Sequence, residues 1–356
     1  MKRILKSFCA ALIALLPVVA VAQIDGEFVK PRNGKFLLKN ATVVTVTKGT
    51  LINTSVLLDN GKIIQVGTTI SSDGAEVIDC TGMFIYPGII DGGTRLGLVE
   101  VSSVPETVDY SDVGNVTPNM QALTTVNPNS EAIGVTRVSG VTTVLTVPTG
   151  GLFPGTAALI NLNGYTPDQM YGGFKAVAMT FPSSGRRGRF DRRSDEDIKK
   201  DGEKAMKEAN DIWDNAKSYL ELKKSGAELT YFPEMEQLSK VITGELSLLI
   251  EVNSASDILN AIKWVEGKDI KVIFTGVAEG WRVAEQIAKA KIPVVTGPIQ
   301  DLPTRGSDRY DTPYANAGML AKAGVKVALR TDEEENVRNL PFHAAFAAAY
   351  GLGKEE

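Results

Sequence analysis

Short apolar runs alternate with helical stretches through the second half of the chain, and this rhythm constrains the fold more than any other feature. Apolar runs without strict alternation are typical of strands that are buried on both faces. Helical patterns over residues 256–266 and 280–290 separate several of these runs, and repeats of strand, helix and strand predict parallel β/α units. An α/β fold with a (β/α) barrel over residues 86–356 fits them best. The runs are residues 141–147, 246–250, 270–274, 292–295 and 325–329.

Residues 23–85 have a different pattern and predict a small separate β module. Residues 41–46 are rich in β-branched side chains, and residues 51–58 and 62–66 flank the turn Asp59-Asn60-Gly61. An Asn-Gly pair between two β-prone runs predicts a hairpin, because both residues tolerate the positive φ of a tight turn. We therefore expect a small N-terminal β-sandwich module before the barrel.

The first 22 residues have the parts of a secretory signal peptide. Three basic residues precede the apolar residues 8–16, and Ala20-Val21-Ala22 fits a cleavage site. A membrane anchor is the alternative, but the apolar stretch is shorter than the roughly 20 residues that span a bilayer. We expect cleavage after Ala22 and a periplasmic or secreted protein that has no membrane association afterwards. Cys80 is then the only cysteine, so no disulfide within the chain is expected.

Charge gives little indication of a partner. The chain has 38 Lys and Arg against 42 Asp and Glu, a formal net charge of −4. A mildly acidic chain has no general electrostatic reason to bind nucleic acid, and no nucleic-acid partner is expected. Arginines gather at residues 186–193, but acids interleave with them and a charged helical stretch follows. We interpret residues 186–224 as a solvated insertion helix that Ser194 caps, in preference to an anion-binding patch.

Residues 86–98, with the sequence YPGIIDGGTRLGL, form the most specific motif. With residues 59–67, 77–82 and 339–345, this motif resembles the amidohydrolase superfamily, especially its imidazolonepropionase-like group. The corresponding pattern in that group is Pro-Gly-x-Ile-Asp-x-His-x-His-x-Gly. The resemblance covers nearly all of the chain after residue 22. It also implies further strands after the last helix, so we expect a C-terminally incomplete copy of the family's fold.

The resemblance implies hydrolysis of non-peptide C–N bonds in small cyclic amides by a metal-activated water, commonly on zinc. The chain departs from the family at the positions of the metal-binding histidines. Only Asp332 keeps the family's residue type, and the chain has a single histidine, His343. A histidine-rich metal site is therefore excluded, and impaired catalysis is expected. The degenerate positions are Gly93, Arg95, Glu251 and Gly276.

Two interpretations of the remaining carboxylates stay open. Asp91, Glu251 and Asp332 would lie at strand ends, where their oxygens suit a hard cation such as Mg²⁺, and Asp332 is then the candidate catalytic residue. The alternative is that they form ion pairs, which the sequence favours. A guanidinium at Arg95 repels a cation and offers a partner to Glu251 or Asp332. If the carboxylates form ion pairs, no cofactor is expected. If they form an oxygen-only site, a divalent metal is expected.

Three further features have a structural and a functional interpretation. Gly150 and Gly151 follow a buried strand, so their backbone amides, with Arg95, are candidates for binding an anionic group; the alternative is a tight turn that needs positive φ. His343 lies in an apolar helical pattern and is expected to be packed and hydrogen-bonded rather than catalytic. The acidic run at residues 332–335 is expected to be a solvated loop.

The sequence leaves three hypotheses of function. In the first, a homologue without the catalytic metal binds a small molecule or serves as a partner subunit, as a homo-oligomer or with a related amidohydrolase. In the second, the protein is a hydrolase that uses a carboxylate-bound metal. In the third, it is a non-catalytic interaction protein of the cell envelope. The first predicts a formed pocket, the second a stoichiometric metal, and the third a barrel end that side chains fill.

Overall fold

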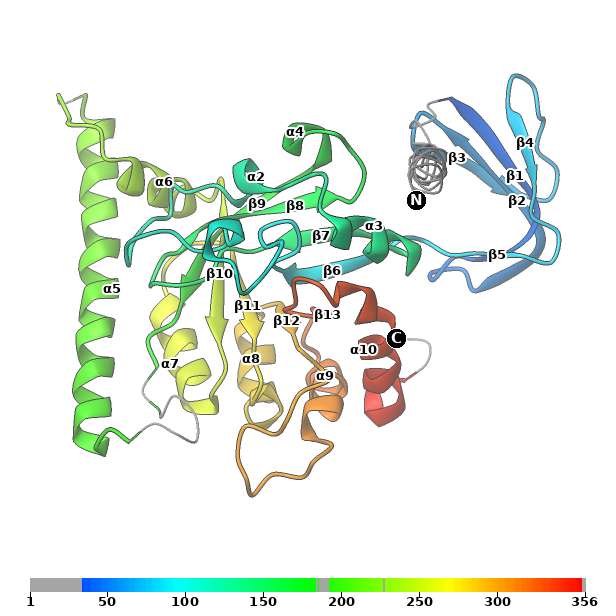
Figure 1. The fold of residues 1–356 in the computed structure, drawn as a ribbon. Coiled ribbons are helices and arrows are strands. Elements are labelled where there is room, and N and C mark those ends of the chain that lie inside the picture. Colours follow the sequence, from blue (N-terminus) through cyan, green and yellow to red (C-terminus); the bar gives the residue numbers. More distant parts are fainter. Residues whose placement is uncertain (1–33, 184, 186–191, 227, 354–356) are drawn as a thin grey trace, which may run out of the picture. The chain divides into compact units, whose positions relative to one another are not determined.

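The computed structural model describes residues 34–183, 185, 192–226 and 228–353, and the chain divides into two compact units, residues 1–87 and 88–356 (Figure 1). The predicted signal peptide and three of the clustered arginines lie outside the described residues. Among the described residues, no helix combines the length and the apolarity that crossing a bilayer requires. The three arginines are Arg186, Arg187 and Arg189.

The described part of the first unit is a five-stranded sheet with the order β3-β2-β1-β4, in which β5 also pairs with β1. The predicted hairpin is confirmed, since β2 and β3 are antiparallel and the turn residues Asn60 and Gly61 have φ of 46° and 76°. A small core forms around Ala41, Val43 and Val56. The strands are β1 (Lys35–Val44), β2 (Thr50–Asp59), β3 (Lys62–Gly67), β4 (Glu76–Asp79) and β5 (Phe84–Ile85).

The described residues of this unit, 34–87, form one sheet, which is the separate N-terminal β module that the sequence predicted. The central strand β1 is ten residues long and has irregular register between Leu38 and Ala41 and between Ala41 and Val43. Its first half pairs in parallel with β4 and its second half with β5. A strand with such irregularities bends and twists more strongly. The bend lets the two halves of β1 pair with two different strands, β4 and β5.

The second unit contains an eight-stranded sheet with the order β6 to β13, curled into a nearly closed barrel. Neighbouring strands are parallel except for β8, which is antiparallel to both β7 and β9. The rhythm of the sequence predicted the barrel but not β8 or β9. The strands are β6 (Ile89–Thr94), β7 (Val141–Thr146), β8 (Gly155–Asn161), β9 (Tyr171–Thr180), β10 (Ser247–Val252), β11 (Val272–Gly276), β12 (Val294–Thr296) and β13 (Val327–Leu329).

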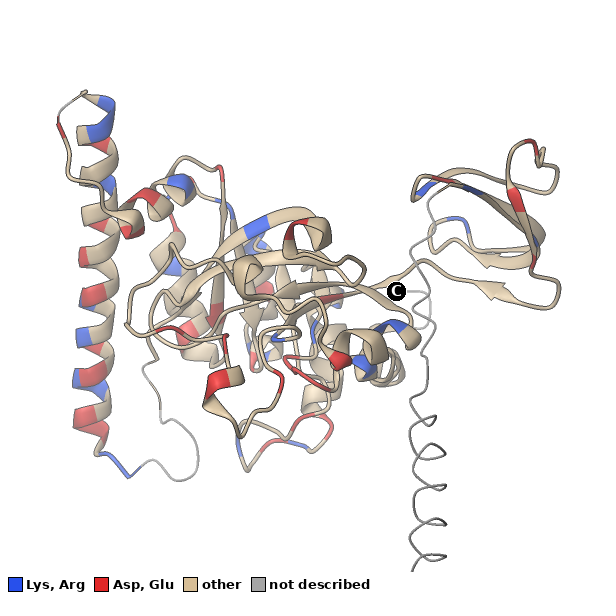
Figure 2. Cartoon of the chain, turned by 45° about the horizontal axis from the view of Figure 1, so that its top comes forward, with Lys and Arg blue, Asp and Glu red and all other residues tan. Residues whose placement is uncertain are grey.

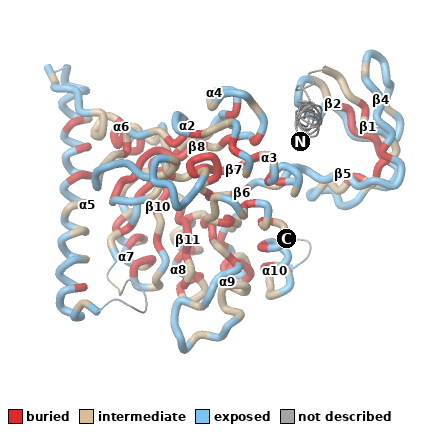
Figure 3. The backbone as a smooth tube through the Cα atoms, viewed as in Figure 1, coloured by how far each residue is buried: buried red, intermediate tan, exposed pale blue. Residues whose placement is uncertain are grey.

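Helices cover the outside of the parallel strands, and α7, α8 and α9 follow β10, β11 and β12 in turn (Figure 1). Their inner faces join the largest apolar core, which is buried along the strands (Figure 3). The α-helices are α2 (Ala122–Thr125), α3 (Glu131–Val138), α4 (Pro167–Met170), α5 (Asp195–Lys224), α6 (Pro233–Ile242), α7 (Ala255–Val265), α8 (Ala284–Ala290), α9 (Thr312–Lys322) and α10 (Leu340–Ala347). Short 3-10 or π segments are η1 (Pro105–Thr107), η2 (Gly280–Arg282), η3 (Val337–Asn339) and η4 (Ala348–Leu352).

The predicted charged helix is α5, which carries acidic and basic side chains along its whole length (Figure 2). The hydroxyl of Ser194 accepts a hydrogen bond from the backbone N–H of Asp197 at 3.1 Å, which confirms the predicted N-cap. Ile212, Trp213 and Ala216 lie on the buried side of the helix. Exposed charges on the other side contribute little stability, so packing of this apolar stripe holds the helix in place.

Polar groups join the two ends of the barrel sheet. The buried carboxylate of Asp91 on β6 accepts hydrogen bonds from the backbone N–H and the hydroxyl of Thr331, which follows β13. The backbone N–H of Asp332 donates to the carbonyl of Gly93 at 3.0 Å, and the N–H of Arg95 donates to the carbonyl of Glu333 at 2.9 Å. These bonds bring the segment after β13 beside β6 and fix the acidic residues that follow it.

Candidate functional site

A pocket of about 350 Å³ opens where the strands β10 to β13 end. We call it the mouth pocket. The carboxyl ends of barrel strands are where side chains from different strands converge, so this is the expected place for a ligand. The segment between β12 and α9, residues 297–311, forms one side of it and is called the rim loop. The lining consists of Glu251, Asn253, Gly276, Ala278, Trp281, Thr296, Gly297, Pro298, Asp301, Leu302, Pro303, Thr304, Thr312, Pro313, Asn316, Arg330 and Asp332.

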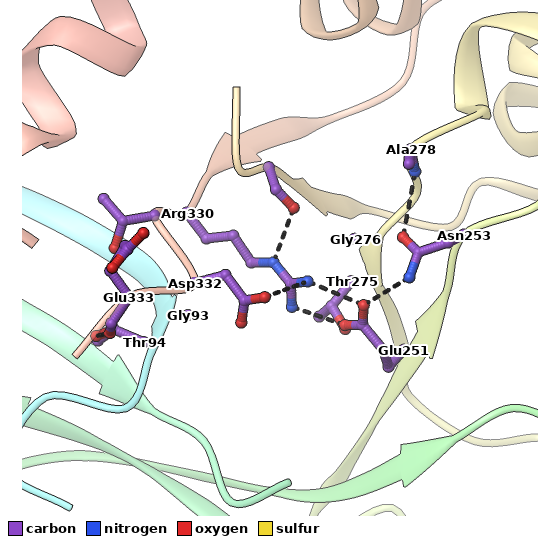
Figure 4. A network of polar contacts seen from close by, with 12 residues as sticks. Gly93, Thr94, Glu251, Asn253, Thr275, Gly276, Ala278, Arg330, Asp332 and Glu333 are labelled. Carbon is purple, nitrogen blue, oxygen red and sulfur yellow. Dashed lines mark hydrogen bonds and ion pairs between the residues drawn. The ribbon is translucent and has the colours of Figure 1, made fainter. Parts of the chain in front are cut away.

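Arg330 organises the floor of the mouth pocket. Its guanidinium donates to both carboxylate oxygens of Glu251, at 2.7 and 2.9 Å, and its Nε donates to the carbonyl of Gly297 at 3.1 Å. Figure 4 shows the guanidinium between the carboxylates of Glu251 and Asp332. The Arg330 side chain is only 6% exposed. A guanidinium so enclosed and so fully paired is a permanent positive charge in the floor of the pocket.

Glu251, on β10, has all its acceptor positions in use. Besides Arg330, it accepts from the Thr275 hydroxyl at 2.6 Å and from the Asn253 amide at 2.9 Å. Burial opposes its ionisation, but the charge and hydrogen bonds of Arg330 outweigh burial and hold the pKa of Glu251 below its ordinary value. Glu251 is therefore an ionised, fully bonded partner of Arg330 and has little capacity left for a ligand.

Asp332 is the carboxylate with unused capacity. Its oxygens lie 3.6 Å from Arg330 and 3.9 Å from Arg95, too far for hydrogen bonds, and no side-chain hydrogen bond to it is formed by the described residues. Burial raises the pKa of Asp332, and the charges of Glu251 and Glu334 add to this, against the two arginines. The residue has a φ of 58°, a left-handed conformation that is uncommon outside glycine and is found often at functional sites.

Arg95 is placed beside Asp332 but pairs chiefly with another acid. Its guanidinium makes two hydrogen bonds to Glu334, at 2.7 and 3.1 Å, and one to the backbone carbonyl of Asp332. Of the two partners expected for Arg95, Asp332 lies within ion-pair distance at 3.9 Å, and Glu251 is bound by Arg330 instead. The expectation of a solvated acidic loop at 332–335 is wrong for Asp332 and Glu334, which are half-buried and form ion pairs.

Asp91 lies in the barrel seam rather than on the pocket lining. Besides Thr331, it accepts from the backbone N–H of Gly93 at 2.9 Å. Burial raises its pKa to about 6, against the hydrogen bonds from Thr331 and Gly93. Its oxygens are committed to closing the barrel, so the structure does not bring Asp91 together with Glu251 and Asp332 as the proposed oxygen-only site requires.

Gly93 and Gly276, at positions where the resemblance implies metal-binding histidines, leave little room beside Arg330 and Glu251. A Cβ on Gly93 would lie 3.1 Å from Cδ of Arg330. A Cβ on Gly276 would lie 2.3 Å from Oδ1 of Asn253 and 2.5 Å from Oε1 of Glu251, and φ there is 76°. Histidines at these positions would collide with the polar network. Among the described residues no group of three His, Cys, Asp or Glu side chains is arranged to hold a metal, so the family's metal does not fit.

The remaining candidates lie elsewhere. Gly150 and Gly151 have φ of 93° and 79°, and line a different hollow from the mouth pocket. The amides of Thr149 and Leu152 beside them bond to the carbonyls of Tyr110 and Asn115. The positive φ values of both glycines agree with the turn interpretation.

His343 on α10 is buried, and its Nδ1 accepts from the backbone N–H of Ile299 at 3.2 Å. Burial lowers its pKa. The prediction of a packed, hydrogen-bonded histidine is confirmed.

Comparison with known proteins gives the ancestry. No family model matches the chain. It is 36% identical over 90 residues to D-hydantoinase of Geobacillus stearothermophilus and 31% identical over 103 residues to dihydroorotase of Pelotomaculum thermopropionicum. These stretches cover 25% and 23% of this chain and 18% and 24% of those proteins, so the chain matches about a fifth of the length of these relatives. The crystal structure of an amidohydrolase from Thermotoga maritima matches far more widely, with 26% identity, a TM-score of 0.75, and coverage of 90% of this chain and 85% of that one.

The chain belongs to the amidohydrolase superfamily. The amidohydrolase barrel and its separate N-terminal sheet are both present. Membership in the imidazolonepropionase-like group stays a prediction. The residue that the sequence did not single out is Arg330, although it directly follows the last strand and lies two positions before Asp332.

Proposed function

We propose that this chain is a metal-independent amidohydrolase homologue that binds a small molecule in the mouth pocket and does not carry out the superfamily's metal-assisted hydrolysis. The observation that carries the proposal is the Arg330 guanidinium, bonded to both oxygens of Glu251 and 3.6 Å from Asp332. A fixed cation in this place occupies both oxygens of Glu251, so that Glu251 is not free to act as a metal ligand.

Two observations favour a binding protein over a purely structural one. The pocket is open rather than filled by side chains, and Asp332 leaves its oxygens without hydrogen bonds toward it. An unbonded carboxylate in a partly enclosed place costs free energy, which a ligand can recover. We further propose that the chain is exported after signal cleavage. A protein that binds a small molecule in this pocket can also act as a partner subunit of a related amidohydrolase.

The alternative function is hydrolysis with a carboxylate-bound metal, which family ancestry favours. It requires Arg330 to leave Glu251, so that Glu251 and Asp332 become free as ligands. The bidentate geometry of the pair opposes this.

Metal content of the purified chain tests the proposal. The protein is dialysed against a weak chelator and measured by mass spectrometry, with hydantoin and dihydroorotate hydrolysis followed in added Zn²⁺ and Mn²⁺. We expect a folded protein with far less than one metal per chain and no hydrolysis above the buffer rate. One metal per chain that is lost in Asp332→Ala would instead establish the carboxylate-metal hydrolase.

A further inference from the structure

The charges of the mouth pocket do not balance. Its ionisable lining consists of Glu251, Asp301, Asp332 and Arg330, three acids against one base. Arg330 is bonded to Glu251, and the neighbouring Arg95 is bonded to Glu334. Each arginine therefore has a closer carboxylate than Asp332. Arg95 and Arg330 together carry two positive charges, against three negative charges on Glu251, Glu334 and Asp332. Nearby Asp91 and Glu333 add further negative charge and no compensation.

The ligand-facing group of the pocket is Asp332. Its carboxylate lines the pocket, keeps 35% of its side chain exposed, and receives no hydrogen bond from the described side chains or backbone. A carboxylate can accept about four hydrogen bonds, so a ligand with several N–H donors is favoured over one with acceptors. The backbone of Asp332 is held in place by the hydrogen bond from its N–H to the carbonyl of Gly93.

Part of the lining of the mouth pocket is apolar. The apolar lining residues include Trp281, Pro298 and Leu302. Leu302, on the rim loop, is 82% exposed, which is unusual for a leucine side chain. Arg282 covers the Trp281 ring at 4.1 Å, so the indole is held by the protein's own cation. A pocket that combines apolar lining residues with one unbonded carboxylate suits a molecule with an apolar body and a charged N–H group at one end.

We propose that the mouth pocket binds a small organic monocation, an amidinium or ammonium, with its N–H groups on Asp332 and its apolar body against Trp281, Pro298 and Leu302. This rests on the proposed function and names its ligand class. The cation supplies the charge that the group of arginines and carboxylates lacks. A neutral molecule of the same shape makes the apolar contacts but leaves Asp332 uncompensated.

Benzamidine and benzamide are the probes, since they have nearly the same shape and only benzamidine is charged at neutral pH. Titration calorimetry on the whole purified chain measures both dissociation constants. The indole N–H resonance of Trp281, assigned with Trp281→Phe, reports whether the probe occupies this pocket. We expect benzamidine to bind at least about tenfold more tightly, the effect of one or two charge-assisted hydrogen bonds, and to shift the Trp281 resonance.

Two variants locate the charge that matters. Asp332→Asn keeps the shape and tolerates the left-handed backbone, and it should weaken benzamidine binding by about tenfold or more while leaving benzamide unchanged. Glu333→Gln is the matched control, because it removes an adjacent charge that does not line the pocket, and it should change benzamidine binding by about threefold or less.

The outcomes separate this inference from the proposed function. Equal affinity for the two probes, no saturable benzamidine binding, or unchanged binding in Asp332→Asn each overturns the monocation. None of these outcomes puts metal into the protein, so the metal-independent pocket survives them. Conversely, one metal per chain defeats the proposed function whatever benzamidine does.

Discussion

Two arginine–glutamate pairs in this molecule are alike in geometry and opposite in burial. In the mouth pocket, Arg330 is 6% exposed and its partner Glu251 is 32% exposed. At the rim loop, Arg305 is 52% exposed and its partner Glu279 is 3% exposed. Both pairs have two hydrogen bonds between guanidinium and carboxylate. The enclosed member is a cation in the first pair and an anion in the second.

The difference predicts how much free energy is lost when each pair is broken, because the buried member of the pair cannot return to water. Enclosed Glu279 has other donors, the Thr304 hydroxyl at 3.0 Å and the backbone N–H of Ala255 at 2.9 Å. Among the described residues, the enclosed Arg330 has only the Gly297 carbonyl as a partner besides its carboxylates. A charge that loses its partner inside a protein costs far more than one that returns to water. The same substitution should therefore have different effects at the two places.

The largest effect is expected for Glu251→Gln. It leaves the enclosed Arg330 with Asp332 at 3.6 Å as its nearest anion, so the free energy of unfolding should fall by about 3 kcal/mol, the lower end for breaking a buried pair. Urea denaturation at neutral pH measures it. A loss below about 1 kcal/mol, the size of a surface pair, would show that the mouth is wetter than its burial implies.

Asp91 should give the next largest effect, as a dependence of stability on pH. Its pKa is about 6 in the folded chain against an ordinary 3.8. The folded state therefore holds the proton more tightly, so this stabilisation is complete below the unfolded pKa and is lost as pH rises through 6. The loss should total about 2 to 3 kcal/mol between pH 4 and pH 7.

The control for Asp91 is Asp91→Asn, which removes only this titration. Subtracting its unfolding free energies from those of the parent cancels Glu251 and Glu279, whose lowered pKa values make stability fall in the opposite direction, as pH drops. A difference that stays flat across this pH range would mean that Asp91 is ionised throughout.

Glu279→Gln breaks the second pair and should cost less, about 1 to 2 kcal/mol. The orphaned Arg305 lies at the surface and is solvated there, while the glutamine oxygen still accepts from Thr304 or Ala255. Urea denaturation beside Glu251→Gln makes the comparison direct. Equal costs at the two sites would contradict the idea that the buried member decides the effect.

The sequence predicted the barrel, the Asn60-Gly61 hairpin and the α5 cap, because each rests on a local pattern. It placed Glu251 and Asp332 correctly at strand ends. The Arg330–Glu251 pair escaped prediction because the two residues are 79 positions apart and nothing local selects one carboxylate among several. The antiparallel β8 was missed for a related reason, since its direction depends on β7 and β9 rather than on its own residues.

The smallest effect is expected where a neutral donor is removed from the rim pair. Thr304→Val deletes one hydroxyl bond to Glu279, which keeps Arg305 and the Ala255 amide, so the cost should be about 0.5 kcal/mol.

Thr275→Val is the counterpart in the mouth, where the buried hydroxyl donates to Glu251 at 2.6 Å. Removing this hydroxyl leaves Glu251, the partner of Arg330, with one hydrogen bond fewer, so the free energy of unfolding should fall by about 1 to 2 kcal/mol. Thermal melting of both variants ranks them. If Thr304→Val proves the costlier, the enclosed anion depends on every donor it has, and the contrast between mouth and rim reverses.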